Sequence, residues 1–139
     1  VAAIRSNVRR FGIKLVVVDY LQKIMPSGRH EKRTYEVGEV SMKLKAVAAS
    51  TGVALLCLAQ LNRDTEKDKG RPPRLADLGD SKQIEQDADV VALLDRKRGE
   101  KVGDAALVIA KQRDGECGLV PLTFNGAFCR FETKGPEID

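Results

Sequence analysis

The sequence has few aromatic residues and no long apolar run. Tryptophan is absent and aromatic residues make up only 4% of the 139 residues, so the core must be packed with aliphatic side chains. No apolar stretch approaches the roughly 18 residues that a membrane-spanning helix needs, and the first residues do not form the apolar segment of a signal peptide. With 42% apolar and 32% charged residues, the chain is typical of one domain of the α/β class.

Cysteine and histidine are also scarce, which argues against two kinds of site. Cys57, Cys117 and Cys129 are odd in number and form no C-x-x-C motif, so we expect neither a disulfide framework nor a zinc site. The single histidine, His30, is expected at the surface rather than in a catalytic role. The net charge of +4 permits a polyanionic partner without identifying one. These features favour a protein of a reducing cytoplasm.

Apolar periodicity predicts the elements of the first half of the chain. Ile4, Val8 and Phe11 recur at helical spacing, and a glycine follows them where a helix would end. The uninterrupted apolar run after it indicates a parallel strand covered on both faces. The expected elements are a helix ending at Gly12, a strand over 14–20, a helix over 34–50 stopped by Gly52, and a strand over 53–59. The chain begins without methionine and inside what reads as an element already under way, which suggests a fragment.

The second half is predicted to hold a short helix, two strands and a hairpin. The helix is expected over 80–89, capped by Asp80 or Ser81, and the strands over 90–94 and 105–110. The Asn125-Gly126 pair lies between two alternating runs and suits the positive φ angles of a type I′ turn, so we expect a hairpin with a two-residue turn. The predicted fold is therefore α/β, with a mostly parallel central sheet flanked by helices and a C-terminal β-hairpin.

Polar side chains end two of the predicted parallel strands. Asp19 follows the apolar run in LVVVDYLQ, and Gln60 follows the next strand in LLCLAQLNR. In open α/β sheets ligands gather at the carboxyl ends of strands. A carboxylate there can hold Mg²⁺ beside the phosphates of a nucleotide, and a neutral amide can sense the γ-phosphate. The simpler alternatives are a turn cap for Asp19 and a first polar residue after a strand for Gln60.

A pair of cations ends a later strand. Lys111 and Arg113, in KQRDG, are two residues apart, so both side chains are expected on one face of the strand. Two neighbouring cations repel each other unless an anion lies between them. Arginine suits the charge of a phosphoryl group in transfer, often across a subunit boundary. The alternative is a solvated strand end.

Two polar segments and three aromatic residues complete the candidates. The basic segment 23–33 could lie near a nucleic-acid backbone, whereas 62–74 has mixed charge and is expected to be a surface loop. Phe124, Phe128 and Phe131 flank the predicted hairpin turn, where packing is a more economical role than base stacking.

Four strings appear together in a specific order: VVVDYLQ, LAQLNR, IEQDAD and KQRDG followed by LTFNGAFCRFE. As an ordered set they resemble the second half of the RecA-like motor domain of DnaB-type hexameric replicative DNA helicases, from about Lys14 to Glu132. The resemblance implies that the whole chain, 1–139, is a partial RecA-like motor domain that begins near the Walker B strand.

The resemblance also implies site residues. Asp19 would be the Walker B aspartate that organises Mg²⁺, Gln60 would sense the γ-phosphate, and Lys111 with Arg113 would reach the ATP of the neighbouring subunit. The stretch 77–83 matches the loop that holds single-stranded DNA, so the implied DNA contacts are Gly79, Asp80, Lys82, Gln83 and the nearby Arg63. This loop departs from the family, which reads close to D-L-R-E-S-G-S where the chain has DLGDSKQ.

The phosphate-binding loop of such motors is absent from the sequence. No G-x-x-x-x-G-K-[ST] occurs, so the phosphate cradle, its lysine and its Mg²⁺-binding hydroxyl are missing. The resemblance therefore implies the C-terminal portion of an ATP-dependent helicase, with ATP and Mg²⁺ as ligands. The implied partners are single-stranded DNA and the other subunits of a homo-hexamer. The implied location is the cytoplasm of a bacterial or phage-infected cell. The chain alone is expected to be inactive as an ATPase.

Two other functions remain open at this point. The chain could be a stand-alone helicase remnant that acts as a non-catalytic protein- or DNA-binding module. It could also be a recombinase-type RecA relative, although the hairpin string disfavours this. An upstream Walker A motif in the same reading frame would decide between a fragment and a remnant.

Overall fold

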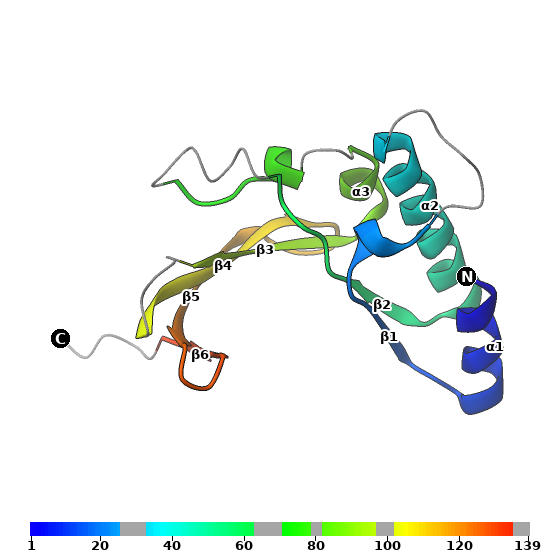
Figure 1. The fold of residues 1–139 in the computed structure, drawn as a ribbon, viewed down its shortest axis with the longest axis horizontal. Coiled ribbons are helices and arrows are strands. Elements are labelled where there is room, and N and C mark those ends of the chain that lie inside the picture. Colours follow the sequence, from blue (N-terminus) through cyan, green and yellow to red (C-terminus); the bar gives the residue numbers. More distant parts are fainter. Residues whose placement is uncertain (26–32, 63–70, 79–81, 97–101, 135–139) are drawn as a thin grey trace. The chain divides into compact units, whose positions relative to one another are not determined.

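The structure, a computed structural model, describes residues 1–25, 33–62, 71–78, 82–96 and 102–134. The chain divides into two compact units (Figure 1): a first unit of Val1–Asp64 and Ala76–Ala88, and a second of Thr65–Leu75 and Asp89–Asp139. Within the described ranges, no helix combines the length and the apolar character needed to cross a membrane.

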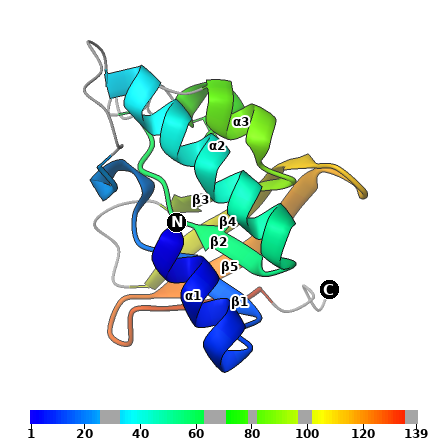
Figure 2. The ribbon, with the colours of Figure 1, turned by 90° about the vertical axis from the view of Figure 1, so that its right-hand side faces the viewer.

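The first unit contains a two-stranded parallel sheet and its helices. In chain order its elements are α1 (Ala2–Phe11), β1 (Leu15–Val18), the 3-10 helix η1 (Leu21–Lys23), α2 (Arg33–Thr51), β2 (Ala54–Cys57) and α3 (Lys82–Asp87). The 3-10 helix η3 (Leu75–Leu78) precedes α3 and belongs to this unit from Ala76 onward. β1 and β2 pair in register from Leu15 with Ala54 to Val18 with Cys57. Figure 2 shows α1 and α2 in front of these strands, so the helices cover one face of the pair.

The core of the first unit lies between that face and α2. It is a cluster of buried aliphatic side chains with partly buried neighbours: Leu21, Val37, Val40 and Leu44, packed by Ile4, Val18, Leu55, Cys57 and Ile84. α2 supplies three of the four buried members because they recur at helical spacing along one stripe. The core therefore holds η1, the segment directly after β1, against α2.

The opposite face of β1 and β2 is exposed, which differs from the expectation of strands covered on both faces. Leu15 and Val17 alternate with half-buried neighbours along β1, and Ala54 and Leu56 do the same along β2. An alternating and a fully covered strand look alike in sequence when both sets of positions are apolar. The helical boundaries, in contrast, were predicted correctly: Gly12 and Gly52 follow α1 and α2 with φ angles of 63° and 66°.

The second unit is a four-stranded antiparallel sheet in the order β3-β4-β5-β6. Its strands are β3 (Val90–Arg96), β4 (Val102–Gln112), β5 (Gly118–Asn125) and β6 (Arg130–Thr133). The α/β class and the C-terminal hairpin are confirmed, but parallel pairing in the described residues is limited to β1 and β2. Five residues separate β3 from β4, and a parallel crossover needs a dozen or more. Antiparallel pairing of these two strands follows from that short connection.

The hairpin between β5 and β6 has a longer turn than predicted. Asn125 pairs with Arg130, so four residues rather than two form the connection. The Asn125 Oδ1 atom accepts a hydrogen bond from the N–H of Ala127 at 3.2 Å, and the positive φ, 49°, belongs to Cys129. The expected type I′ turn at Asn125-Gly126 is therefore wrong, because the asparagine side chain bonds the main chain two residues on.

The aromatic residues of the hairpin divide into two kinds. The rings of Phe124 and Phe131 are 4.8 Å apart, and the Arg96 guanidinium lies 4.0 Å from the centre of the buried Phe124 ring. These two phenylalanines therefore pack as expected. Phe128, at the turn, is 72% exposed, so the expected packing role is wrong for this residue. The four-residue turn places it beyond the ladder that pairs Phe124 with Phe131.

Candidate functional site

The carboxyl ends of β1 and β2 meet at one edge of the first unit because the two strands are neighbours and parallel. Pairing continues past the strands: the N–H of Leu58 donates to the carbonyl of Val18, and the N–H of Leu21 donates to the carbonyl of Leu58, both at 2.9 Å. Asp19 lies between these two bonds along the chain, so its backbone is held at the end of β1. Its side chain is exposed.

Gln22 connects this edge to Gln60. The Gln22 side chain donates from Nε2 to the Gln60 carbonyl at 3.1 Å and accepts at Oε1 from the Gln60 N–H at 3.3 Å. Both bonds use the main chain of Gln60, so its side chain is not needed for them. Gln22 thus fixes the segment that carries Gln60. Composition and periodicity gave no sign of this role, although the YLQ string after Asp19 belongs to the resemblance.

The edge is hollowed beside these residues. An open hollow of about 340 Å³ is lined by Tyr20, Leu58, Ala59 and Gln60. The Lys23 ammonium lies 5.2 Å from the centre of the Tyr20 ring, and the peptide bond between Asp19 and Tyr20 is cis. The hollow therefore offers an aromatic ring and a neutral amide next to an exposed carboxylate.

The donor set suits a cation that is shared with a phosphorylated ligand. Within the described ranges, no three His, Cys, Asp or Glu side chains gather to form a metal site by themselves. Mg²⁺ differs from zinc or calcium in this respect, because it commonly keeps several waters and takes one or two carboxylates together with the phosphate oxygens of a nucleotide. A single exposed aspartate at the end of a strand fits that pattern, and Asp19 is the residue that would hold the ion.

The Lys111/Arg113 pair belongs to the second unit, at the end of β4. The register shifts between Ala92, opposite Ile109, and Val91, opposite Lys111, so Ala110 is an extra residue in β4. Such a bulge bends the strand and redirects the side chains after it. Lys111 is half-buried and Arg113, one residue beyond β4, is exposed.

Asp89 binds Arg113 through both main chain and side chain. The Arg113 N–H donates to the Asp89 carbonyl at 2.9 Å, and the Arg113 Nη1 lies 2.8 Å from the Asp89 Oδ1. The two side chains are 53% and 54% exposed, so solvent screens the ion pair and an approaching anion can compete for the guanidinium. Sequence reasoning missed Asp89 as a partner, although it closes the IEQDAD string directly before β3.

The predicted DNA-contacting loop is only partly described. Arg63, Gly79 and Asp80 lie outside the described residues. Lys82 begins α3 with an exposed side chain. Gln83 packs against α2. A Cβ atom built on Gly38 of that helix would lie 3.4 Å from the Cβ atom of Gln83.

A side-chain network joins α3 to α2. The Gln83 Nε2 donates to the Asp87 Oδ1 at 2.9 Å, and the buried Ser41 Oγ donates to the Asp87 Oδ2 at 2.6 Å. Both oxygens of one carboxylate are thereby used, one by each helix. The network fixes the start of α3, where the predicted loop ends.

Comparison with known proteins identifies the family. The family model of the DnaB-like helicase C terminal domain matches residues 1–133. The chain belongs to this family. It is 41% identical over 140 residues to the replicative DNA helicase DnaB of Leifsonia xyli subsp. xyli, covering 97% of the chain and 31% of that protein.

Solved structures agree with this family and with a RecA-like ATPase fold. A solved ATPase domain superposes with a TM-score of 0.82 at 32% identity, covering 96% of the chain and 49% of that structure. A DnaB-like replicative helicase, solved with its interactions with primase, superposes with a TM-score of 0.75 at 32% identity over 88% of the chain and 32% of its own. The chain thus spans about a third of the DnaB relative and about half of the ATPase domain.

Proposed function

We propose that this chain is the C-terminal part of the motor of an ATP-dependent replicative DNA helicase, which couples ATP hydrolysis between subunits to movement along single-stranded DNA. The observation that carries the proposal is the shared edge of β1 and β2. There Asp19 follows one strand and the Gln22–Gln60 pairing fixes the other. Family membership supplies the reaction class for this arrangement.

In this proposal Asp19 and Gln60 act on the nucleotide of their own subunit. Asp19 would hold Mg²⁺, directly or through water, and the ion would supply positive charge beside the phosphates. The Gln60 amide remains neutral at all physiological pH values and can hydrogen-bond a terminal phosphate. Loss of that phosphate removes the hydrogen bond. Gln60 thereby relays hydrolysis to the segment that follows it in the chain.

Lys111 and Arg113 act on the nucleotide of the neighbouring subunit. The exposure of Arg113 supports this role, because a finger that works between subunits must extend from its own surface. Asp89 holds the Arg113 guanidinium until phosphate oxygens replace its carboxylate. A guanidinium can bind those oxygens through two parallel hydrogen bonds, which an ammonium cannot do.

The partners follow from the same reading. The neighbouring subunits of a homo-hexamer provide the second half of each ATP site. Single-stranded DNA lies against the loop of Gly79, Asp80, Lys82 and Gln83, with Arg63 as a further contact. L. xyli is a bacterium, which supports a role in the cytoplasm of a bacterial or phage-infected cell.

Hydrolysis measured in two contexts tests the proposal. In a full-length helicase carrying this segment, Asp19→Asn should lower Mg²⁺-dependent ATP hydrolysis at least about a hundredfold, because the neutral amide holds the ion poorly. Asp104→Asn, an exposed aspartate on β4, should leave it unchanged. The 139-residue chain alone, which lacks the phosphate-binding loop, should show no saturable hydrolysis. This account would be contradicted if the isolated chain showed Mg²⁺-dependent turnover and Asp19→Asn abolished that turnover.

A further inference from the structure

The net charge of the protein is concentrated in α1 and the residue that leads into β1. The first 18 residues contain four basic side chains, Arg5, Arg9, Arg10 and Lys14, and no acidic one. Removing these four from the 24 basic residues of the chain leaves 20, which balance its 20 acidic residues. The whole formal charge of +4 therefore resides here.

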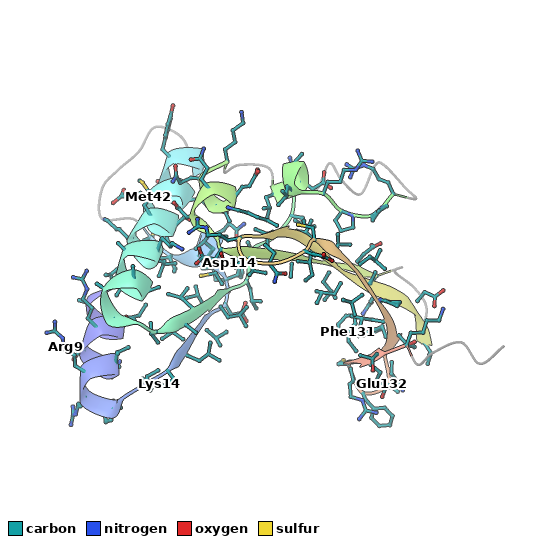
Figure 3. All side chains as sticks on the ribbon, turned by 180° about the vertical axis from the view of Figure 1, so that it is seen from behind. Arg9, Lys14, Met42, Asp114, Phe131 and Glu132 are labelled. Carbon is teal, nitrogen blue, oxygen red and sulfur yellow. The ribbon has the colours of Figure 1, made fainter. Side chains whose placement is uncertain are left out.

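These four side chains point into solvent. No residue of α1 is buried, and all four basic residues are exposed. Ile4 packs against the core, which leaves the other faces of the helix outward. Figure 3 shows Arg9 on the side of α1 that faces away from β1, and Lys14 where the chain enters β1.

Helix stability does not account for this arrangement. Arg5 and Arg9 are one turn apart on the same face, and like charges at that spacing destabilise a helix by about 0.2–0.5 kcal/mol. Arg9 and Arg10 in the last turn do favour the helix dipole, but that end carries only about half a negative charge. Four cations thus leave a large positive excess that a bound anion would offset.

An exposed aromatic ring lies next to one of these cations. Phe11, the last residue of α1, is 63% exposed, and the Arg10 guanidinium lies 5.1 Å from the centre of its ring. A flat ring beside a guanidinium can stack on a nucleic-acid base while the cations contact phosphates. The apolar residues Ile4 and Val8 are half-buried, so α1 lacks a free apolar face for insertion into a membrane.

We propose that this surface, formed by Arg5, Arg9, Arg10, Phe11 and Lys14 and here called the α1 surface, binds the backbone of a single-stranded nucleic acid. None of its residues belongs to the site described above, and binding at this surface does not depend on ATP. It would give the chain a second contact with nucleic acid, separate from the 79–83 loop.

Fluorescence anisotropy with a labelled oligothymidylate of about 20 nucleotides tests this binding. The four cations of the α1 surface should contribute about −2.8 to the slope of log affinity against log salt, since each phosphate contact with a single strand contributes about −0.7. Arg5→Ala with Arg9→Ala should reduce the slope by about 1.4 and weaken binding at least about tenfold in roughly 0.1 M salt. Circular dichroism should show the same helix content, because neither side chain is buried.

A second double variant controls for net charge. Arg130→Ala with Lys134→Ala also removes two positive charges, but these side chains pair with Glu132 and Asp104 on the second unit. It should change affinity less than twofold. Equal weakening by both double variants would overturn the proposal, because net charge alone would then explain the binding.

Two further probes separate a nucleic acid from an acidic protein. Phe11→Leu should weaken binding of the oligothymidylate several-fold and leave binding of inorganic polyphosphate unchanged, because only the former offers bases for stacking. Polyglutamate of similar charge should bind more weakly than the oligothymidylate. Equal or tighter binding of polyglutamate would contradict the nucleic-acid assignment and favour an acidic protein partner.

Discussion

The Arg113 guanidinium and the Asp89 carboxylate lie 2.8 Å apart, and a main-chain hydrogen bond of 2.9 Å joins the same two residues. The main-chain bond fixes where the Arg113 side chain begins, and the exposed ion pair sets its direction. An exposed pair contributes at most about 1 kcal/mol to stability. Its main consequence is therefore the orientation of Arg113 before any phosphate arrives.

Replacing Asp89 should separate orientation from stability. In a full-length helicase carrying this segment, Asp89→Ala should lower turnover about two- to fivefold, because Arg113 must then be ordered during the reaction. The KM for ATP should stay within about twofold. Asp104→Ala, which removes the exposed pair with Lys134 on the same sheet, should leave turnover unchanged. A loss of thermal stability equal for both variants, with unchanged turnover, would show that Asp89 has no positioning role.

The contact between α2 and α3 should depend on Ser41. This side chain is 8% exposed and donates to Asp87 at 2.6 Å, so Ser41→Ala leaves one carboxylate oxygen without that donor. We expect a loss of about 1–2 kcal/mol in the free energy of unfolding, measured by urea denaturation. Ser50→Ala is the matched control, since Ser50 donates to the carbonyl of Val47 within its own helix. It should be neutral or slightly stabilising. Equal effects of the two substitutions would exclude the interhelical bond as the cause.

The hairpin turn should be stabilised by a glycine at its last position. Cys129 has a φ of 49°, which glycine adopts without the steric cost of a Cβ atom. Cys129→Gly should therefore raise the free energy of unfolding by about 0.5–1 kcal/mol. Cys117→Gly, at an exposed position without a positive φ, should lower it by a similar amount. Thermal unfolding of both variants measures the difference, and a destabilised Cys129→Gly would contradict the turn geometry.

The Cys57 thiol should remain protonated in mildly alkaline solution. Burial raises its pKa from the ordinary value of 9.0 to about 11. The contribution of Cys57 to the free energy of unfolding is fully present below about pH 9, where the unfolded chain also keeps the thiol proton. It is lost as the pH rises towards about 11. Iodoacetamide at about pH 8.5 should modify the exposed Cys117 and Cys129 well before Cys57. In Cys57→Ala, the free energy of unfolding should fall less across this alkaline range. A fall of unchanged size would mean that other ionisable groups cause it.

Local patterns predicted α1, β1, α2, β2 and α3 of the first unit because each has its own signal, but they did not predict the 3-10 helices η1 and η3. The glycines after α1 and α2 have positive φ angles, as a helix stop requires, and β1 and β2 follow from their apolar runs. Pairing direction in the second unit was harder to predict. β3 and β4 have the apolar composition of buried parallel strands, and only the short connection between them reveals an antiparallel pair.

The candidate site shows the same division between local and distant information. The resemblance named Asp19, Gln60, Lys111 and Arg113, since each lies in a recognisable string. It did not give their partners, because Gln22 meets Gln60 across 38 residues and Asp89 meets Arg113 across two strands. Such contacts depend on the register of the sheet, which no local pattern encodes.

The central claim is that Arg113 acts on ATP held by the neighbouring subunit, and mixing subunits tests it most directly. In a full-length helicase carrying this segment, Arg113→Ala should reduce hydrolysis about 10³–10⁵-fold with ATP affinity within a few fold, and Arg113→Lys should not restore it. Subunits with a defective phosphate-binding loop should be equally inactive. The two defects lie on opposite sides of one interface, so mixed rings contain some intact sites. The account predicts that hydrolysis returns on mixing these two inactive proteins. Normal hydrolysis by Arg113→Ala rings, or no recovery in mixed rings that assemble, would contradict it.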